Sequence, residues 1–242
     1  TLVVVILFSS GIILFWSQNN QHSVIKVTVE PGATLMHIAN MLYDKDIISN
    51  KQTFQLAVRL MGRERKIPIG TFNLVNAKSN YDIINQIIYG APEVKKVRIL
   101  EGWNINQIAG HLSKEMNLDS TKITSLCNDS NFVRSNGISE SSLEGYLFPD
   151  TYFFYVGDKP KSILKHLIKM NKSFWTKNHL LQSKKLNLSK HQVLTLASII
   201  EGEAIYDSEH AKISGVYHNR LKKGMKLQAD PTIQYIIPDS PR

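Results

Sequence analysis

The side chain best placed for chemistry in this sequence is the carboxylate of Glu201, near the end of the apolar stretch 193–203. Ser189 is followed three residues later by Gln192, which is the pattern of a helix capping box. We therefore expect a helix that begins near Lys190, runs through the apolar stretch and carries the carboxylate close to its end.

The neighbours of Glu201 on that helix suggest how its acid would behave. At helical spacing the residue follows Leu194, Ala197 and Ser198, which predicts a place among core-facing side chains. Desolvation there would raise the pKa of the carboxyl, and a protonated acid can donate to a leaving group. A simpler interpretation is that Glu201 and Glu203 end a buried helix in solvent.

Further strings accompany the helix: LEGYLFPDTY at 143–152, NRL at 219–221 and LQADPT at 227–232. With SIIE at 198–201, in this order and spacing, they resemble the endolytic murein transglycosylases of bacterial envelopes, the YceG-like family. The resemblance extends over nearly the whole chain. It implies a membrane anchor, a LysM-like module and a catalytic domain whose essential glutamate is Glu201.

The resemblance also implies a reaction. Glu201 would protonate the glycosidic oxygen between N-acetylmuramic acid and N-acetylglucosamine, then accept the proton of the muramyl C6 hydroxyl, leaving a 1,6-anhydro end. Most glycosidases instead use two carboxylates. Glu201 and Glu203 cannot form that pair, because positions two apart on a helix face different ways. A loop acid, Glu144, Asp150 or Asp230, remains the alternative partner.

The candidate substrate contacts lie in the same strings. They are Glu144, Tyr146, Asp150, Tyr152, Ser198, Asn219, Gln228 and Asp230. The aromatic members would stack on sugars or form core. Pro231 disfavours helical backbone at Asp230, so an extended or turning loop is expected there, and the Asp230 carboxylate could cap the next turn.

A second helix is expected after the first. Asp207 or Ser208 can cap it, Gly224 can end it, and its buried stripe would be Ile213, Val216, Tyr217 and Leu221. Asp207, Glu209 and His210 cluster near its start, but without the spacing of a metal site. No cofactor or metal motif occurs, so none is predicted.

The charge balance points to anionic partners. The 242 residues carry a formal net charge of +9, which favours phospholipid heads, murein carboxylates or nucleic acid. No nucleic-acid-binding motif is present, so nucleic acid is not expected. Lys161, Lys165, Lys169 and Lys172 recur at helical spacing as the solvated face of an amphipathic helix. Cys127 is the sole cysteine and is expected to pack as a small apolar residue.

The N-terminal residues predict a membrane segment. Residues 2–16 are mostly apolar, although shorter than the ~20 residues that span a bilayer. The sequence begins without methionine, so we expect a truncated single-pass anchor. Residues 17–25 lack Lys and Arg, which favours a body outside the cytoplasm, at the bacterial inner membrane.

The predicted organisation is α+β. It comprises an anchor at 1–16, a linker at 17–23, a LysM-like α/β module at 24–92 and a mixed α+β catalytic domain at 93–242. Relatives continue beyond residue 242, so that domain is expected to be incomplete. The expected partners are peptidoglycan glycan strands, the membrane and peptidoglycan synthases. The alternative function is a non-catalytic, LysM-like peptidoglycan-binding or scaffold protein.

An internal repeat at a spacing of 70 residues supports this organisation. Val27-x-Val29 and Val97-x-Ile99 each precede a glycine and an apolar helical pattern, with Thr34 and Asn104 as expected N-caps. Between the copies, residues 70–74 suggest a short strand, and Ser79 with Asp82 suggests a capped helix.

Overall fold

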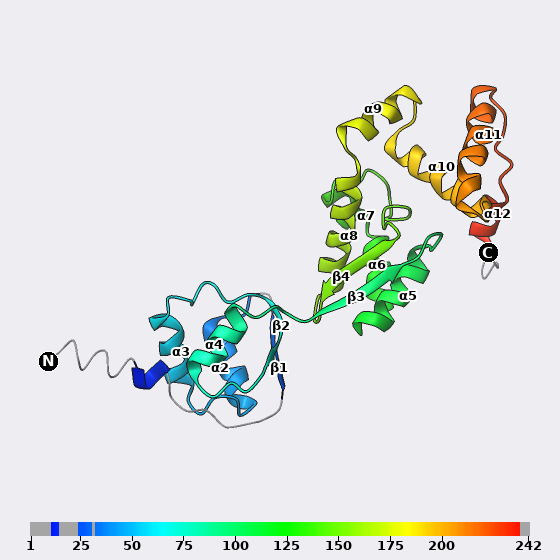
Figure 1. Ribbon diagram of the computed structural model, residues 1–242. Helices are drawn as coiled ribbons and strands as arrows, with labels where there is room; N and C mark the ends of the chain where they lie inside the picture. Colours follow the sequence, from blue (N-terminus) through cyan, green and yellow to red (C-terminus); the bar gives the residue numbers. More distant parts are fainter. Residues whose placement is uncertain (1–10, 15–23, 31, 238–242) are drawn as a thin grey trace. The chain divides into compact units, whose positions relative to one another are not determined.

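The computed structural model describes residues 11–14, 24–30 and 32–237 (Figure 1). These residues form a mixed α+β fold of many helices and short strands, which confirms the expected class. They cluster into two compact units. The first contains the described residues up to 96 together with 153–158, and the second contains 97–152 and the residues from 159 onward.

The first unit is built on one antiparallel strand pair. Its elements are β1 (Ile25–Val29), α2 (Leu35–Asp44), α3 (Lys51–Leu60), β2 (Gly70–Leu74) and α4 (Asn80–Ile88). β1 pairs with β2 so that Val27 lies opposite Phe72. The inward side chains of the sheet pack with the apolar faces of the helices, among them Ile38 of α2, Phe54 of α3 and Ile84 of α4. Apolar burial on this scale is the main stabilising term of the unit.

The segment 153–158 joins the first unit through hydrogen bonds to the buried residue Thr71 and to Glu93. Thr71 Oγ1 donates to the carbonyl of Val156 at 2.9 Å and lies 3.0 Å from Thr28 Oγ1. The backbone N–H groups of Glu93 and Val156 donate to the carbonyls of Thr71 and Glu93, at 2.6 and 2.9 Å. These bonds satisfy polar groups next to the strand pair and hold the returning chain there.

The second unit is mainly helical. The chain passes between the units within β3 (Val94–Ile99) and β4 (Asp150–Tyr155), which pair in a second two-stranded sheet. The helices are α5 (Ile105–Met116), α6 (Ser120–Cys127), α7 (Ser130–Ser135), α8 (Pro160–Phe174), α9 (Lys177–Lys185), α10 (Lys190–Glu203), α11 (His210–Lys222) and α12 (Asp230–Ile236), with a 3-10 turn η1 (Asp207–Glu209). α6 contacts α5, α7 and α8, whereas α10 contacts α9, α11 and α12.

The helix starts were readable from sequence. Thr34 caps α2, Ser79 caps α4 and Asn104 caps α5, and in each case the side chain accepts a backbone N–H of the first turn. At α5 the box is complete, because Gln107 Oε1 also accepts the N–H of Asn104 at 3.0 Å. The repeated strand and helix pattern, the strand at 70–74 and the burial of Cys127 are confirmed.

Most of the predicted anchor and all of its linker lie outside the described residues. Residues 11–14 are helical, and Ile13 and Leu14 pack against the core of the first unit. Within the described ranges, every helix is too short or too polar to cross a bilayer. The LysM-like character of residues 24–92 and the domain limits stay predictions.

Candidate active site

Helix α10 is held at its start by side-chain caps and along its length by a narrow apolar stripe. Ser189 Oγ accepts the N–H of Gln192 at 3.1 Å, and Gln192 Oε1 accepts the N–H of Ser189 at 2.8 Å, which confirms the predicted capping box. Leu196 and Ile199 are buried against Tyr217 of α11. Two buried residues in 14 leave much of this apolar helix uncovered.

Glu201 lies on the uncovered side of α10. Its side chain is 41% exposed, and both Ala197 and Ser198 on the same face are exposed. The prediction that these residues are core-facing is therefore wrong. The reason is that Tyr217 of α11 and Ala229, just before α12, pack on the stripe of Leu196 and Ile199, so burial is confined to that side of the helix. The carboxylate is consequently accessible to a large ligand.

His210 is the nearest ionisable partner of Glu201. Its Nε2 lies 3.3 Å from Oε2 of Glu201, and its side chain is 35% exposed. The turn between the helices sets this geometry, since Glu209 Oε2 accepts the N–H groups of Ile205 and Tyr206 at 3.1 Å each. The acid and the imidazole thus stand close enough to share a proton.

The start of α11 differs from the prediction. Asp207 and Ser208 lie in η1, and α11 begins at His210 without a side-chain cap. Val216 and Leu221 are exposed, so the expected buried stripe reduces chiefly to Tyr217. A short helix with one neighbour can bury only one side-chain row.

Tyr217 binds the second carboxylate of α10. Its hydroxyl donates to Glu203 Oε1 at 2.7 Å, and the residue is buried. Burial, reinforced by the hydrogen bond and charge of Glu203, raises the pKa of Tyr217 to about 12. Glu201 and Glu203 therefore engage different partners, as expected for positions two apart.

Helix α12 packs on the end of α10 through a glycine. A Cβ on Gly202 would lie 2.8 Å from Cβ of Pro231, so only glycine permits this approach. Asp230 and Pro231 open α12, and Ala229 precedes it in extended conformation. The expected extended chain at Asp230 is wrong, because proline is well suited to a first helical turn. Asp230 makes no side-chain cap.

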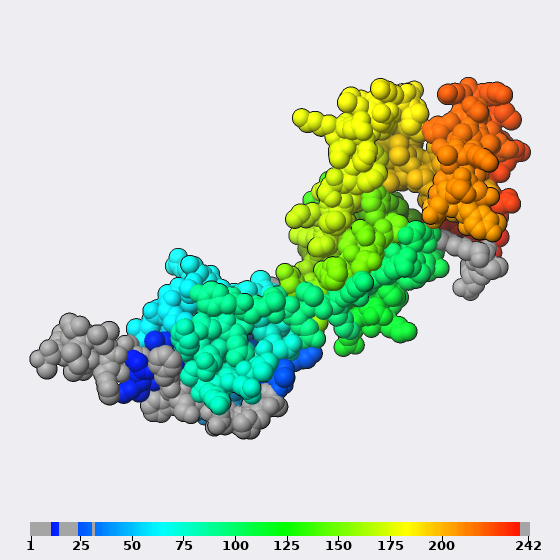
Figure 2. All heavy atoms as spheres, viewed as in Figure 1, coloured from blue at the N-terminus to red at the C-terminus, as the bar shows by residue number. Residues whose placement is uncertain are grey.

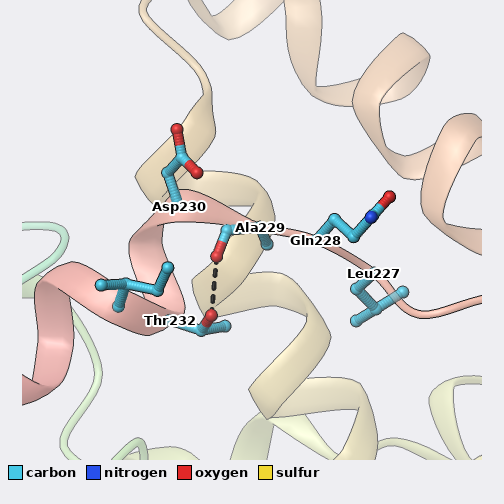
Figure 3. Close-up of a pocket in the computed structure, with 6 residues that line it drawn as sticks. Leu227, Gln228, Ala229, Asp230 and Thr232 are labelled. Atoms are coloured by element: carbon cyan, nitrogen blue, oxygen red, sulfur yellow. Dashed lines mark hydrogen bonds between the residues drawn. The ribbon is translucent and has the colours of Figure 1, made fainter.

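The loop before α12 and the first turn of that helix form a pocket of about 450 Å³. It is lined by Leu227, Gln228, Ala229, Asp230, Thr232 and Ile233 (Figure 3). Thr232 Oγ1 donates to the carbonyl of Ala229 at 2.6 Å, and the side chains of Asp230 and Gln228 point away from that bond (Figure 3). The guanidinium of Arg220 donates to the carbonyl of Leu227 and fixes the loop to α11.

The remaining predicted contacts on α10 and α11 are exposed. Ser198 Oγ donates to the carbonyl of Thr195 at 2.8 Å, one turn before Glu201. Asn219 is exposed on α11 and does not line the pocket. Gln228, Asp230 and Glu201 thus share the α10 to α12 region, whereas Asn219 lies apart from the pocket.

The predicted contacts in 143–152 have structural partners. Glu144 Oε2 accepts the N–H of Ile105, the first residue of α5, at 3.2 Å. The side chain of Asp150 accepts the N–H of Thr151 at 2.6 Å. Both carboxylates therefore accept hydrogen bonds from backbone N–H groups. Neither hydrogen bond shows that the residue contacts a substrate.

The two tyrosines of this string are buried. Tyr152 donates to the carbonyl of Phe148 at 2.8 Å, and burial, with a smaller effect of Asp150, raises its pKa to about 12. The ring of Tyr146 stacks on His191 at 6.0 Å, and its hydroxyl lies 3.4 Å from Nδ1. This pair connects the string to the first turn of α10. Substrate contact for both stays a prediction.

Sequence reasoning missed the proximity of His210 to Glu201. Its position nine residues after Glu201 gave no periodic signal, because a turn intervenes. Among the described residues, no group of three or more His, Cys, Asp or Glu could hold a metal ion. The site is thus defined by one accessible acid, its histidine and a neighbouring pocket.

The fold and site define a two-unit α+β protein with an acid-bearing helix beside a loop pocket. Residues 27–242 match the model of the YceG-like family. The chain belongs to that family.

Named relatives agree with this membership. The chain is 29% identical over 234 residues to an endolytic murein transglycosylase of Bacillus subtilis (strain 168), covering 90% of this chain and 64% of that protein. It is 24% identical over 243 residues to one from Streptococcus pneumoniae (strain D39), covering 89% of this chain and 44% of that protein. The chain therefore spans less than two thirds of each.

A solved structure shares the fold. The crystal structure of a yceG-like protein from Listeria monocytogenes superposes with a TM-score of 0.57 at 26% sequence identity. The match covers 92% of this chain and 78% of that one.

Proposed function

We propose that this protein is an endolytic peptidoglycan lytic transglycosylase, in which Glu201 acts first as acid and then as base. The observation that carries the proposal is the accessible carboxylate of Glu201, 3.3 Å from His210 and on the helix that contacts the pocket-bearing segment. Relatives named endolytic murein transglycosylase support the substrate class.

The reaction needs one acid only. Protonated Glu201 donates to the glycosidic oxygen as the bond from that oxygen to C1 of N-acetylmuramic acid breaks. The C6 hydroxyl of the same sugar then attacks C1 and returns its proton to the carboxylate. One C–O bond breaks and another forms, no water is consumed, and the carboxyl group ends protonated as it began.

His210 would fix the orientation of the Glu201 carboxyl group. Its Nε2 faces Oε2, so a neutral imidazole can accept the carboxyl proton and a protonated one can donate to the carboxylate. Substrate bound over the exposed face would exclude water from Glu201, which favours the uncharged acid during the first step. Gln228 and Asp230, which line the pocket, are the proposed sugar contacts.

The proposal includes a cellular setting. The apolar residues 2–16 support a single-pass anchor in the bacterial inner membrane, with both units outside the cytoplasm. Residues 24–92 are proposed as the LysM-like module. Peptidoglycan synthases are proposed partners, since new strands reach the wall near the membrane.

The test uses purified sacculi and the full-length protein. The wild type is expected to release fragments with 1,6-anhydro ends, identified by mass spectrometry, and Glu201→Gln to release none. Glu203→Gln is the matched control, because it removes the neighbouring carboxylate and should retain cleavage. Reducing-end products would show hydrolysis and contradict the mechanism. Binding without new ends would favour the non-catalytic scaffold.

A further inference from the structure

The net charge of the chain is confined to one segment. Residues 159–200 contain nine of the 29 Lys and Arg residues and none of the 20 Asp and Glu residues. The rest of the chain therefore holds 20 charges of each sign and balances. The segment covers α8, α9 and most of α10, and all nine of its lysines are exposed.

The lysines of α8 form an exposed row along the helix, and Nζ of Lys161 lies 5.8 Å from the centre of the Phe132 ring. Ile163, Leu164, Leu167 and Ile168 are buried, and α8 contacts α6. Lys161, Lys165, Lys169 and Lys172 stand at spacings of four, four and three, and no ion pair in the described residues involves them. At ~1.5 Å per residue they extend along about 16 Å of helix. Such a row attracts an extended anion.

An aromatic cluster lies where α8 meets α9. The ring of Phe174 stacks on His179 at 4.4 Å and meets the edges of Trp175 and Phe148 at 5.5 and 5.4 Å. Phe174 is nevertheless 46% exposed. Lys190 places Nζ 5.7 Å from the centre of the Trp175 ring. The contacts fix the rings before any ligand arrives, and Figure 2 shows this part of the chain in yellow at the surface.

The combination of lysine row and fixed rings indicates one class of ligand. The C–H groups on the face of a sugar ring can pack on the negative face of an aromatic ring. Carboxylates are attracted to the positively charged lysines. A bilayer fits less well, because an interfacial helix needs a free apolar face and that of α8 is buried in the core.

We propose that the exposed faces of α8, α9 and the first turn of α10, termed the lysine face, bind the murein strand outside the cleavage site through its peptide carboxylates and sugars. This proposal rests on the proposed function for the identity of its ligand. It adds a second binding surface, distinct from Glu201 and the loop pocket. Its role would be to retain a long, charged strand while one bond is cut.

The test compares two triple variants of the full-length Glu201→Gln protein, which cannot cleave. Lys165, Lys169 and Lys172 are changed to Gln in the first variant. Lys96, Lys114 and Lys122, also exposed but outside both this segment and the proposed LysM-like module at 24–92, are changed in the matched control. Co-sedimentation with sacculi free of other wall polymers measures affinity, and thermal unfolding checks that both variants fold.

The lysine-face variant should bind sacculi about tenfold more weakly at low ionic strength, the sum of three modest surface attractions. The control should stay within about twofold of its parent. Amidation of the sacculus carboxylates should weaken the parent to the level of the variant. Equal binding by the two variants would overturn the proposal.

Two further results distinguish a bilayer ligand from the wall, and wall binding from cleavage. If the variant loses binding to anionic phosphatidylglycerol vesicles but keeps its affinity for sacculi, the surface serves a bilayer and the proposal is wrong. If the wild type binds sacculi through these lysines but produces no anhydro ends, the proposed function fails and the lysine face stands as a wall-binding surface.

Discussion

A Cβ atom on Gly202 would lie 2.8 Å from the Cβ of Pro231, closer than packed side chains approach. The backbone of Gly202, in the last turn of α10, therefore lies directly against the proline ring of Pro231, in the first turn of α12. This contact brings the pocket-bearing segment next to the helix of Glu201. Glycine inside a helix ordinarily costs about 1 kcal/mol relative to alanine, but at position 202 the packing against Pro231 requires it.

Gly202→Ala is predicted to destabilise the protein. Helix propensity would gain up to about 1 kcal/mol, but overpacking against the proline ring costs about 1–3 kcal/mol, so a net loss of about 1 kcal/mol is expected in urea unfolding. Gly215→Ala on α11 is the control, because a Cβ there meets no atom within 4 Å. It should be neutral or stabilising. Equal stabilisation by both changes would contradict the contact.

His210→Ala is predicted to lower kcat about tenfold with little change in KM for strand cleavage. His210 Nε2 lies 3.3 Å from Glu201 Oε2, where it would orient the acid in the proposed reaction, and loss of a positioning contact acts mainly on the reacting geometry. His218→Ala, on the same helix, is the matched control and should keep near wild-type kcat. A change in KM alone would instead assign His210 to substrate binding.

Alkaline stability should depend on Tyr217. Its pKa of about 12 lies above the ordinary 10, since burial and then Glu203 disfavour the phenolate. The unfolded state therefore loses this proton first, and stability falls by up to about 1.4 kcal/mol per pH unit between about 10 and 12. Tyr217→Phe should lower stability by about 1–3 kcal/mol at neutral pH and remove that part of the slope. An unchanged slope in pH-dependent urea unfolding would refute the assignment.

Local sequence signals predicted the starts of helices well. The caps at Ser79, Asn104 and Ser189 act within three residues, so the pattern and its hydrogen bonds are visible in the sequence itself. The strand at 70–74 was equally readable, because glycine and apolar residues alternate with polar ones over a short run.

The environment of Glu201 was not readable in this way. The sequence of an apolar helix does not reveal which of its sides is covered. The side chains that cover Leu196 and Ile199, Tyr217 and Ala229, come later in the chain. The pairing with His210 depends on the turn that Glu209 stabilises. Contacts that cross a turn leave no period in the sequence.

Cys127 should report on unfolding of the second unit. Burial, with a smaller contribution from the charge of Glu144, raises the pKa of its thiol to about 12. Reaction with Ellman's reagent at pH 8 should thus be negligible in the native state, since the thiolate is the nucleophile. The rate should rise with urea in parallel with loss of helical signal. Fast reaction of the native protein would show that α6 opens locally.

Glu144 is predicted to position α5 and α12 and to make no direct contact with sugar. It accepts the N–H of Ile105 at 3.2 Å, and its charge and hydrogen bond add to burial in raising the pKa of Tyr235 on α12. Glu144→Gln keeps an acceptor and should cost about 0.5–1 kcal/mol of stability. Glu144→Ala loses both bonds and should cost about 1–2 kcal/mol.

The two Glu144 variants also separate positioning from substrate binding. If Glu144 acts by positioning the helices, Glu144→Gln should keep most of the kcat that Glu144→Ala loses. The KM for glycan strands should change little in either variant. The pKa of Tyr235 should fall in both variants, because a negative charge that opposes phenolate formation is gone, and NMR titration of labelled tyrosine can follow it. A large rise of KM in Glu144→Gln, with unfolding unchanged, would instead place this carboxylate against the sugar.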